Sequence, residues 1–299
     1  MDSEDLRAFV ETARRGSFSL AAAALALSQS AVSRRIGRLE QELGIPLLER
    51  TRPAATPTRH GLMVLNFAER TLREWDELRA ASPTSPLTGV LHVAASTTPG
   101  EHLVPALLAE FGHHHAGVRA QMHVMNSDSV EECVRTRHCD VGFLGRPPHG
   151  STLHSVAVAE EEIVLAVPAH HPLATRGQVD LRELTDEVFV AREQGSGTEA
   201  TVRSVLAAAG SALPPHRVTL EVSSPQALLS AVAAGQGIGF VSGLALADAE
   251  SHGMATVRLR DLPILRRVVL IYDPRRLAPT ADAFVRFVQS RLPLCGPCA

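Results

Sequence analysis

The chain of 299 residues contains no lysine, so all 29 of its basic residues are arginines. It has four cysteines, too few in a chain of this length for a disulfide framework. No apolar run approaches the roughly 20 residues of a membrane-spanning helix. The acidic start of the sequence lacks the basic segment of a signal peptide. These absences favour a soluble protein of the cytoplasm that has no membrane partner.

The charge balance excludes a protein that is basic throughout. Because 29 basic residues face 32 acidic ones, the formal net charge is −3, and any surface for nucleic acid must be local. Residues 28–60 contain such a surplus, with six arginines and three glutamates. An apolar content of 45% and a charged content of 20% indicate a folded chain, and its length suits two or three domains.

The N-terminal segment has the pattern of three short helices. The first is predicted over residues 3–15, with Ser3 as its N-cap and Gly16 as its end. An alanine-rich second helix and a tight turn lead to a third helix over 29–43, which Gly44 ends. Two short helices joined by a tight turn suit insertion into the major groove of DNA.

The third predicted helix has two distinct faces, and a short hairpin, or wing, follows it at 47–50 and 55–58. Helical spacing separates an apolar core stripe from a polar outer face. The core stripe comprises Val32, Ile36, Leu39 and Leu43, and the outer face comprises Ser30, Ser33, Arg34 and Gly37.

A long helix is predicted over 59–81, with an apolar seam formed by Leu65, Ala68, Leu72 and Trp75. At 1.5 Å per residue it is about 35 Å long, too long to bury its seam against so small a domain. We therefore expect this helix to pair with a second copy of the chain. The proline-containing segment 82–86 ends it and predicts a linker.

Beyond the linker, short apolar strands alternate with helices, a pattern typical of a parallel α/β sheet. A helix is expected through Phe111, and the chain is expected to re-enter its first lobe near Val268 before a last helix at 280–291. The predicted strands are 90–95, 118–124, 140–144, 163–167, 188–191, 218–222, 238–241 and 268–272.

Motifs along nearly the whole chain carry a family resemblance. The first is Ser28-Gln29-x-Ala31-Val32-Ser33-x-x-Ile36-x-x-Leu39-Glu40-x-x-Leu43-Gly44; later ones are Asp140-Val141-Gly142, Gly195-Ser196-Gly197-Thr198 and Val232-Ala233-Ala234-Gly235-Gln236-Gly237-Ile238-Gly239. In these motifs and their order the chain resembles the LysR-type transcriptional regulators. Leu48, Ala54 and Pro57 depart from the family pattern, and they predict a less regular wing.

The resemblance implies a multidomain α/β architecture and a DNA-binding transcriptional regulator that is not an enzyme and needs no cofactor. It implies a homodimer that assembles further into a homotetramer, and RNA polymerase is kept open as a further partner. The implied parts are a winged helix-turn-helix domain (1–58), a linker and dimerisation helix (59–82), a hinge (83–87) and a periplasmic-binding-protein-like, two-lobed α/β effector domain (88–299), with lobe I at 88–160 and 267–299 and lobe II at 161–266.

The candidate DNA-binding residues lie on the third helix and in the wing. Glutamine and arginine can bind adenine and guanine bidentately, whereas other arginines would hold phosphates and make affinity depend on salt. The alternative is that these arginines form only a solvated surface. The predicted base contacts are Gln29, Ser30, Ser33 and Arg34, and the predicted phosphate contacts are Arg38 (or Arg35), Arg50 and Arg52.

The candidate effector-binding residues follow predicted strands and precede predicted helices, where ligands of open α/β sheets sit. The expected ligand is a small anion. Each hydroxyl has an alternative role as a helix N-cap, and the arginine could instead form a surface ion pair. The candidates are Ser96, Thr97, Thr98, Arg146, Ser196, Thr198 and Ser224.

Other signals compete with this interpretation. Cys295-Gly296-Pro297-Cys298 is a thioredoxin-like tetrapeptide, but only Ala299 follows it in this sequence, and the chemistry needs a helix after the first cysteine. Cys133 and Cys139 could sense oxidants or belong to the core. The adjacent histidines 113–115 do not share one helix face, so no metal site is expected. A ligand-binding or transport protein with the same C-terminal fold is the alternative from another class.

Overall fold

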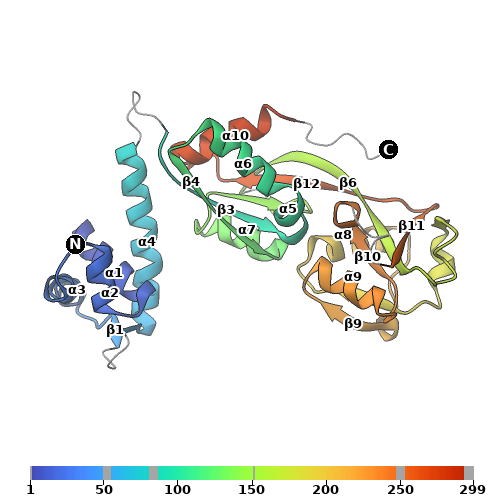
Figure 1. Cartoon of the computed structure of the whole chain (residues 1–299), viewed down its shortest axis with the longest axis horizontal. Coiled ribbons are helices and arrows are strands. Elements are labelled where there is room, and N and C mark those ends of the chain that lie inside the picture. Colours follow the sequence, from blue (N-terminus) through green and yellow to red (C-terminus); the bar gives the residue numbers. More distant parts are fainter. Residues whose placement is uncertain (1, 50–54, 81–86, 151, 247–252, 293–299) are drawn as a thin grey trace. The chain divides into compact units, whose positions relative to one another are not determined.

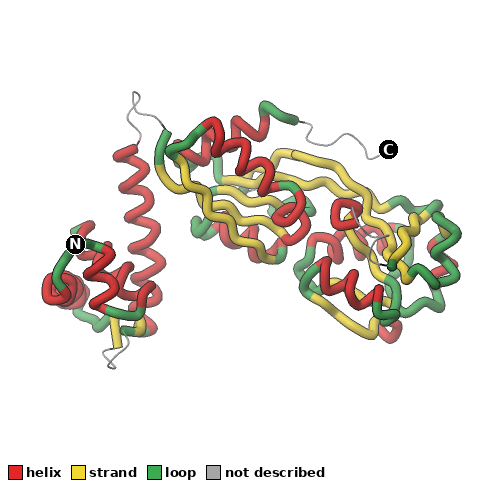
Figure 2. The backbone as a smooth tube through the Cα atoms, in the orientation of Figure 1, coloured by secondary structure: helices red, strands yellow, loops and turns green. Residues whose placement is uncertain are grey.

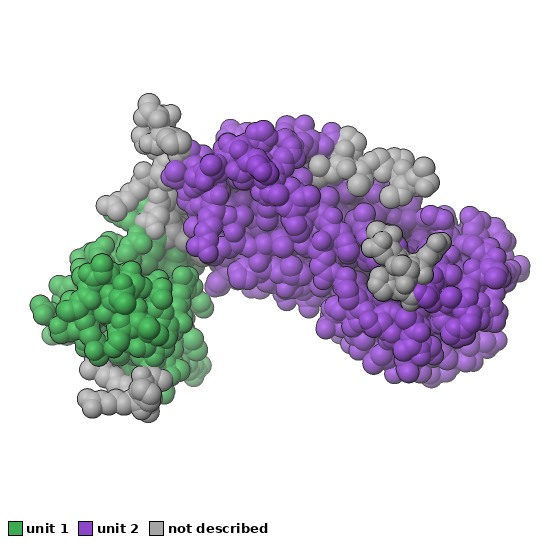
Figure 3. Space-filling model, in the orientation of Figure 1, with its two compact units in different colours: residues 1–85 green, residues 86–299 purple. Residues whose placement is uncertain are grey.

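The computed structural model describes residues 2–49, 55–80, 87–150, 152–246 and 253–292, and for 73, 74 and 76–80 it describes the backbone alone. By its internal contacts the chain divides into two compact units, Met1–Ser85 and Pro86–Ala299 (Figures 1 and 3). No described helix is long and apolar enough to cross a membrane.

Unit 1 is a bundle of helices with a small hairpin. The N-cap of its first helix is Asp2 and not Ser3, because the Asp2 carboxylate accepts the backbone N–H of Glu4. Gly16 ends that helix with a φ of 63°, as predicted. The elements are α1 (Ser3–Arg15), α2 (Phe18–Ala24), α3 (Gln29–Leu43), β1 (Leu48–Glu49), β2 (Thr56–Pro57) and α4 (Arg59–Ala80).

The core of unit 1 contains most of the predicted stripe of α3. Val32, Ile36 and Leu39 are fully buried against α1 and α2. The prediction was wrong for Leu43, which is 40% exposed. Leu43 is the last residue of α3, and the chain turns away at Gly44 with a φ of 70°, so no element covers that side chain.

The apolar seam predicted on α4 serves the core of its own unit. Ala68 and Leu72 are buried in the same cluster as α1, and Leu65 packs against it. The expectation that this stripe stays open for a second copy was therefore wrong for Leu65, Ala68 and Leu72, whereas Trp75 is 48% exposed. The reason is that α4 packs along α1, where Arg14 pairs with Glu69 at 2.8 Å.

The wing is a hairpin of two short antiparallel strands in which Leu48 pairs with Pro57 and Glu49 with Thr56. Its base is ordered by Glu40, whose carboxylate accepts the backbone N–H groups of Leu47 and Leu48. A ladder this short tolerates a proline that cannot donate. The wing residues between the strands lie outside the described residues.

Unit 2 is built on a long mixed sheet of order β4-β3-β5-β12-β6-β11-β7, with β10 paired to β6. A second sheet joins β8 and β9 in parallel. The strands are β3 (Gly89–Ser96), β4 (Val118–Met125), β5 (Val141–Leu144), β6 (His154–Pro168), β7 (Gln178–Val179), β8 (Phe189–Arg192), β9 (Val218–Val222), β10 (Gly239–Ser242), β11 (Met254–Leu259) and β12 (Ile264–Tyr272).

The expectation of an all-parallel sheet was wrong, because β12 runs antiparallel to both β5 and β6. These two long strands run side by side along unit 2 (Figures 1 and 2). Val158 of β6 and Val268 of β12 belong to one apolar core, whereas Ile163 and Ile264 of the same strands belong to another. We call the parts around these cores lobe I and lobe II.

Helices cover both lobes, and the segment predicted as one helix through Phe111 is two helices that meet at Leu103. Pro105 explains the restart, because proline fits the first turn of a helix and not its interior. The helices are α5 (Thr97–His102), α6 (Val104–His114), α7 (Ser127–Arg135), α8 (Gly197–Ala208), α9 (Pro225–Ala233) and α10 (Pro279–Gln289), with 3-10 turns at Leu181–Leu184, Pro215–Arg217 and Gly243–Leu246.

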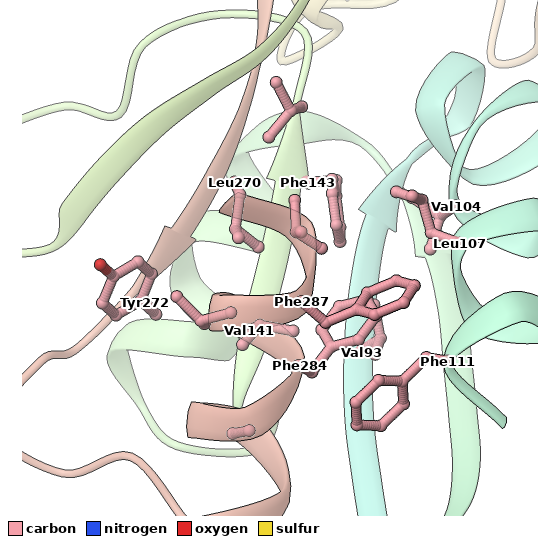
Figure 4. Close-up of a cluster of buried hydrophobic side chains, with 14 of the residues drawn as sticks. Val93, Val104, Leu107, Phe111, Val141, Phe143, Leu270, Tyr272, Phe284 and Phe287 are labelled. Carbon is pink, nitrogen blue, oxygen red and sulfur yellow. The ribbon is translucent and has the colours of Figure 1, made fainter. Parts of the chain in front are cut away.

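The core of lobe I shows how the C-terminal helix is anchored (Figure 4). The ring of Phe111 on α6 meets Phe284 and Phe287 of α10 edge-on, at centroid distances of 5.1 and 5.3 Å. Edge-on contacts of this kind add to the free energy of burying the rings. The end of the described chain is thereby packed into the lobe formed by β3 and β5.

Candidate DNA-binding surface and effector cleft

The recognition helix α3 starts with a polar, exposed end. The Ser28 hydroxyl caps it by accepting the N–H of Ala31 at 3.2 Å, a contact that holds the first turn in place. Gln29, Ser30 and Arg34 are exposed, and Ser33 is half-buried. Among the described residues Arg34 has no ion-pair or hydrogen-bond partner, so its guanidinium is free to contact another molecule.

The other arginines of α3 are tied to α1. Arg35 donates to the Glu4 carboxylate at 2.6 Å, and Arg38 donates to Asp5 at the same distance. Asp5 is buried, whereas the Arg38 side chain is 57% exposed. Arg38 can therefore present part of its charge to a phosphate while it stays paired. Arg50 and Arg52 lie outside the described residues.

The loop after β3 places its hydroxyl side chains against lobe II. Ser96 and Thr98 are buried, and Ser96 makes no side-chain capping bond to α5. The Thr97 hydroxyl accepts from Arg192 of lobe II at 3.3 Å. The Ser96 side chain therefore does not act as the N-cap of α5. Thr97 is the residue of this segment that contacts the opposite lobe directly.

Arg146 is neither a surface ion pair nor an unpaired cation. Its side chain is 7% exposed and donates to Glu131 at 2.9 Å and to Asp128 at 2.6 Å. Glu131 is buried, but the Asp128 side chain is 58% exposed. The Asp128 carboxylate is thus a partner that an anion from solution can replace, whereas Glu131 is fixed.

The glycine-rich loop before α8 lies close against lobe I. The carbonyl of Gly195 accepts the backbone N–H of Ser127 at 3.1 Å. A Cβ at Gly197 would stand 2.8 Å from the Ser127 hydroxyl, so a larger residue there would require the Ser127 side chain to move. Ser196 is buried in this loop and makes no side-chain capping bond to α8. The loop therefore brings its polar groups to the junction of the two lobes.

Thr198 is engaged by a buried ion pair that sequence reasoning missed. Its hydroxyl accepts from Arg266 of β12 at 2.9 Å, and Arg266 pairs with Glu161 of β6 at 2.6 Å. Glu161 also accepts the Ser242 hydroxyl. The alternation along β12 places Arg266 on the buried side, and a charged residue at an inward position is the signal that could have found it.

Arg192 is the second missed residue, and it bridges the lobes. Its side chain is 3% exposed and pairs with Glu193. It also donates to the Ser223 carbonyl of lobe II at 3.1 Å and to the Thr97 hydroxyl of lobe I. Its signal in the sequence is its place directly after a strand, the same argument that selected Arg146.

The predicted effector residues fall into two groups at the lobe junction. Arg192 links Thr97 to the segment that contains Ser224, and the glycine-rich loop joins Ser196 and Thr198 to the neighbourhood of Arg146. Ser224 keeps the alternative role, because its hydroxyl caps α9 by accepting the N–H of Ala227. Its position after β9 remains at the junction.

The remaining signals of the sequence concern cysteine and metal chemistry. Cys139 is buried beside Cys133 in an apolar cluster with Val130 and Ile271. Cys295 and Cys298 lie outside the described residues. Within the part of the chain that the structure describes, no group of three histidine, cysteine or acidic side chains is placed to hold a metal ion.

Comparison with known proteins identifies the family. The sequence profile described as "Bacterial regulatory helix-turn-helix protein, lysR family" matches residues 3–62, and the profile described as "LysR substrate binding domain" matches residues 84–293. The chain belongs to the LysR family of bacterial transcriptional regulators. It is a DNA-binding regulator with a small-molecule effector domain, and the predictions of family and fold class are confirmed.

Individual relatives span nearly the whole chain. The RuBisCO operon transcriptional regulator of Allochromatium vinosum is 31% identical over 290 residues, which cover 95% of this chain and 94% of that protein. Full-length OxyR from Pseudomonas aeruginosa has a TM-score of 0.72 at 22% identity, covering 98% of this chain and 95% of that one. The regulatory domain of CcmR from Synechocystis, in complex with 2-PG, has a TM-score of 0.64 at 25% identity, covering 71% and 100%.

Proposed function

We propose that the N-terminal end of α3 reads base edges in operator DNA through Gln29, Ser30, Ser33 and Arg34. The observation that carries this is the unpaired Arg34 beside a capped helix start, whereas the next two arginines of α3 are held by α1. Helix-turn-helix proteins approach bases with this end of the helix. The phosphate contacts that we propose are Arg38, Arg50 and Arg52.

The DNA proposal is tested by the affinity of the full chain for its own upstream intergenic duplex and for random duplex. Arg34→Ala should cost about 1–3 kcal/mol of discrimination between the two. Arg38→Ala should weaken binding to both duplexes. It should also reduce the slope of log affinity against log salt concentration by the amount expected for about one phosphate contact. Arg15→Ala, which removes an exposed arginine paired with Glu11 on α1, is the control. Equal specificity of Arg34→Ala and the control would contradict the base-contact role.

We further propose that two chains pair through α4, on the face opposite its core stripe. Met63 is 68% exposed and Phe67 41%, and both point away from Ala68 and Leu72 by helical spacing. Trp75 lies on the side of the core stripe by the same spacing, but it is 48% exposed. Apolar side chains this large gain stability when a partner covers them. The resemblance implies that such dimers assemble further into homotetramers.

Sedimentation tests the pairing face. Phe67→Glu should shift the full chain toward the monomer, whereas Gln41→Glu, a charge added at an exposed position of α3, should leave the assembly unchanged. Loss of assembly in both variants would mean that any charge added to unit 1 disrupts it, and the specific face would be wrong.

We propose that the junction of the lobes binds the effector and that the effector is a small anion. The contact residues proposed are those at the junction: Ser96, Thr97, Thr98, Arg146, Ser196, Thr198 and Ser224. Support comes from the buried hydroxyls without capping roles and from Arg146, whose exposed partner Asp128 an anion can replace. The related CcmR regulatory domain was solved with 2-PG, which makes that compound the first probe.

Calorimetry with 2-PG and a panel of small carboxylates tests the site. Thr98→Val keeps the size of a side chain that is 2% exposed and should weaken binding, whereas Thr280→Val, at 5% exposure on α10, is the matched control. Loss of one hydrogen bond to a charged ligand corresponds to about 1.5–3 kcal/mol. Binding that both variants retain would place the effector elsewhere. The boundaries of lobe I (88–160 and 267–299) and lobe II (161–266) remain part of this proposal.

A further inference from the structure

A cavity of about 660 Å³ lies in lobe II next to the lobe junction, with which it shares Arg192 and Thr198. Most of its lining residues come from α8, from β8 and β9, and from the segment between α8 and β9. Its inner walls are apolar, with Leu206, Leu213 and Phe240 among them. Four charged side chains also line it: Arg192, Glu199, Arg203 and Glu221. The cavity thus has room for a small molecule with an apolar body and a polar end.

Arg192 lines this cavity and has one nitrogen without an acceptor. Its Nε donates to Glu193, and its Nη2 donates to Thr97, to Glu193 and to the Ser223 carbonyl. Among the described residues no acceptor contacts Nη1, and this nitrogen is not one of the fully buried atoms that lack a partner. Nη1 is therefore accessible, and the carboxylate of a ligand can reach it.

Glu199 presents the complementary group. Its Oε1 lies 3.0 Å from Nη1 of Arg203, an exposed residue of the next helical turn. Its Oε2 is buried and has no hydrogen-bond partner among the described residues. Burial raises the pKa of Glu199, which is the sign of a carboxylate that lacks a donor. The cavity therefore offers one free donor group and one free acceptor.

We propose that this cavity is a second small-molecule site, which binds an α-amino acid with an apolar side chain. The carboxylate of the ligand would accept from Nη1 of Arg192, and its ammonium group would donate to Oε2 of Glu199. The side chain of the ligand would lie against Leu206, Leu213 and Phe240. The cavity shares Arg192 and Thr198 with the lobe junction, whereas Glu199 and the apolar walls belong to the cavity alone.

The balance of charge selects a zwitterion over other ligands. Two arginines and two glutamates line the cavity, so their formal charges cancel. A simple anion would leave Oε2 of Glu199 without a donor, and a simple cation would leave Nη1 of Arg192 without an acceptor. A neutral hydrocarbon would satisfy neither group. An amino acid supplies both partners without adding net charge to a partly dry site.

The site also couples to the lobe junction through one side chain. Arg192, which lines the cavity, holds the Thr97 hydroxyl of lobe I with Nη2 of its guanidinium. A carboxylate on Nη1 competes with Glu193 for that guanidinium. We therefore expect occupancy of the cavity to change the affinity of the lobe junction for its own ligand, a reciprocal coupling between two sites.

Calorimetry on the full chain tests the proposal with three probes of one apolar shape: L-leucine, 4-methylpentanoate without the amine, and 3-methylbutylamine without the carboxylate. L-leucine should bind saturably, and each single-headed probe should bind at least about tenfold more weakly, since a hydrogen bond to a charged group is worth about 1.5–3 kcal/mol. Glu199→Gln should weaken L-leucine binding by about tenfold and abolish its advantage over 4-methylpentanoate.

Glu162→Gln is the matched control, because Glu162 also pairs with an exposed arginine at 3.0 Å and is 24% exposed against 21% for Glu199. The control should bind L-leucine as the unchanged chain does, and so should Thr98→Val, which alters the lobe junction alone. Three results would each overturn the proposal. They are no saturable binding of L-leucine, equal binding by Glu199→Gln, and loss of L-leucine binding in Thr98→Val.

Discussion

The buried pair of Glu161 and Arg266 gives the sharpest prediction for stability. The two residues are cross-strand partners on β6 and β12, where these strands pass from one lobe to the other. Their side chains are 2% and 3% exposed, and the closest nitrogen and oxygen lie 2.6 Å apart. Thr198 accepts a hydrogen bond from Arg266 and Ser242 donates one to Glu161, whereas Nη2 of Arg266 has no partner with hydrogen-bond geometry among the described residues. Removal of one partner from such a pair leaves a buried charge uncompensated.

Glu161→Gln should therefore destabilise unit 2 by about 3–5 kcal/mol. In a unit of this size each kcal/mol lowers the melting temperature by about 2–4 °C, so the expected fall is about 6–20 °C. Glu162→Gln changes the next residue of β6, whose partner Arg258 is exposed, and should cost at most about 1 kcal/mol. Calorimetric melting of both variants measures the difference.

A double change of Glu161→Leu and Arg266→Met separates charge from packing. If the stability lost in Glu161→Gln comes from an unpaired charge, the double variant should recover most of that stability. The reason is that apolar residues of similar volume often replace a buried ion pair at little cost. Equal melting temperatures for Glu161→Gln and Glu162→Gln would refute the reasoning. So would a double variant that melts below the single one.

Three further predictions concern other parts of the chain. Gly61→Ala should destabilise unit 1 by about 1–3 kcal/mol, because its Cβ would stand 2.0 Å from the Leu47 carbonyl oxygen, whereas Gly37→Ala, with nothing within 4 Å, should stabilise it by about 0.5–1 kcal/mol in urea titrations. Ser28→Ala should remove about 1 kcal/mol of cap stability by the same measurement. Because burial raises the pKa of Glu199 above 4.5, the native state favours the protonated acid, and that stability is lost as pH rises through the shifted pKa. Glu199→Gln should then match the unchanged chain in acid and exceed its stability at pH 7, and a lower stability at pH 7 would contradict the shift.

Local signals in the sequence predicted the elements whose ends are set by neighbouring residues. The bounds of α3 at 29–43 follow from Ser28, whose hydroxyl caps the first turn, and from Gly44, which alone adopts the left-handed conformation at low cost. The strand at 218–222 was equally plain, because Val218, Leu220 and Val222 alternate with polar residues. In contrast, β7 and β11 were missed. Strand β7 has only two residues, and the burial of the side chains along β11 does not alternate.

Features that depend on partners far along the chain could not be predicted from spacing. The seam of α4 was assigned to a second copy because its length was weighed against a small domain, but α1 packs along it and buries Ala68. Arg266 meets Glu161 across 105 positions, and Arg192 meets Thr97 across 95. No local pattern indicates which of many acidic or hydroxyl side chains will lie opposite a given arginine.

The three buried arginines of unit 2 differ in whether a ligand can displace the carboxylates that pair with them. We infer their roles from this difference. Glu161, the partner of Arg266, is 2% exposed and cannot reach water without separating the strands. The partners of Arg146 and Arg192 include Asp128 and Glu193, whose side chains are 58% and 19% exposed. A carboxylate with access to solvent keeps most of its hydration when it is displaced, so a ligand can exchange with it at low cost. Arg266 therefore fixes the strands between the lobes, and the other two arginines are the ones that ligands can recruit.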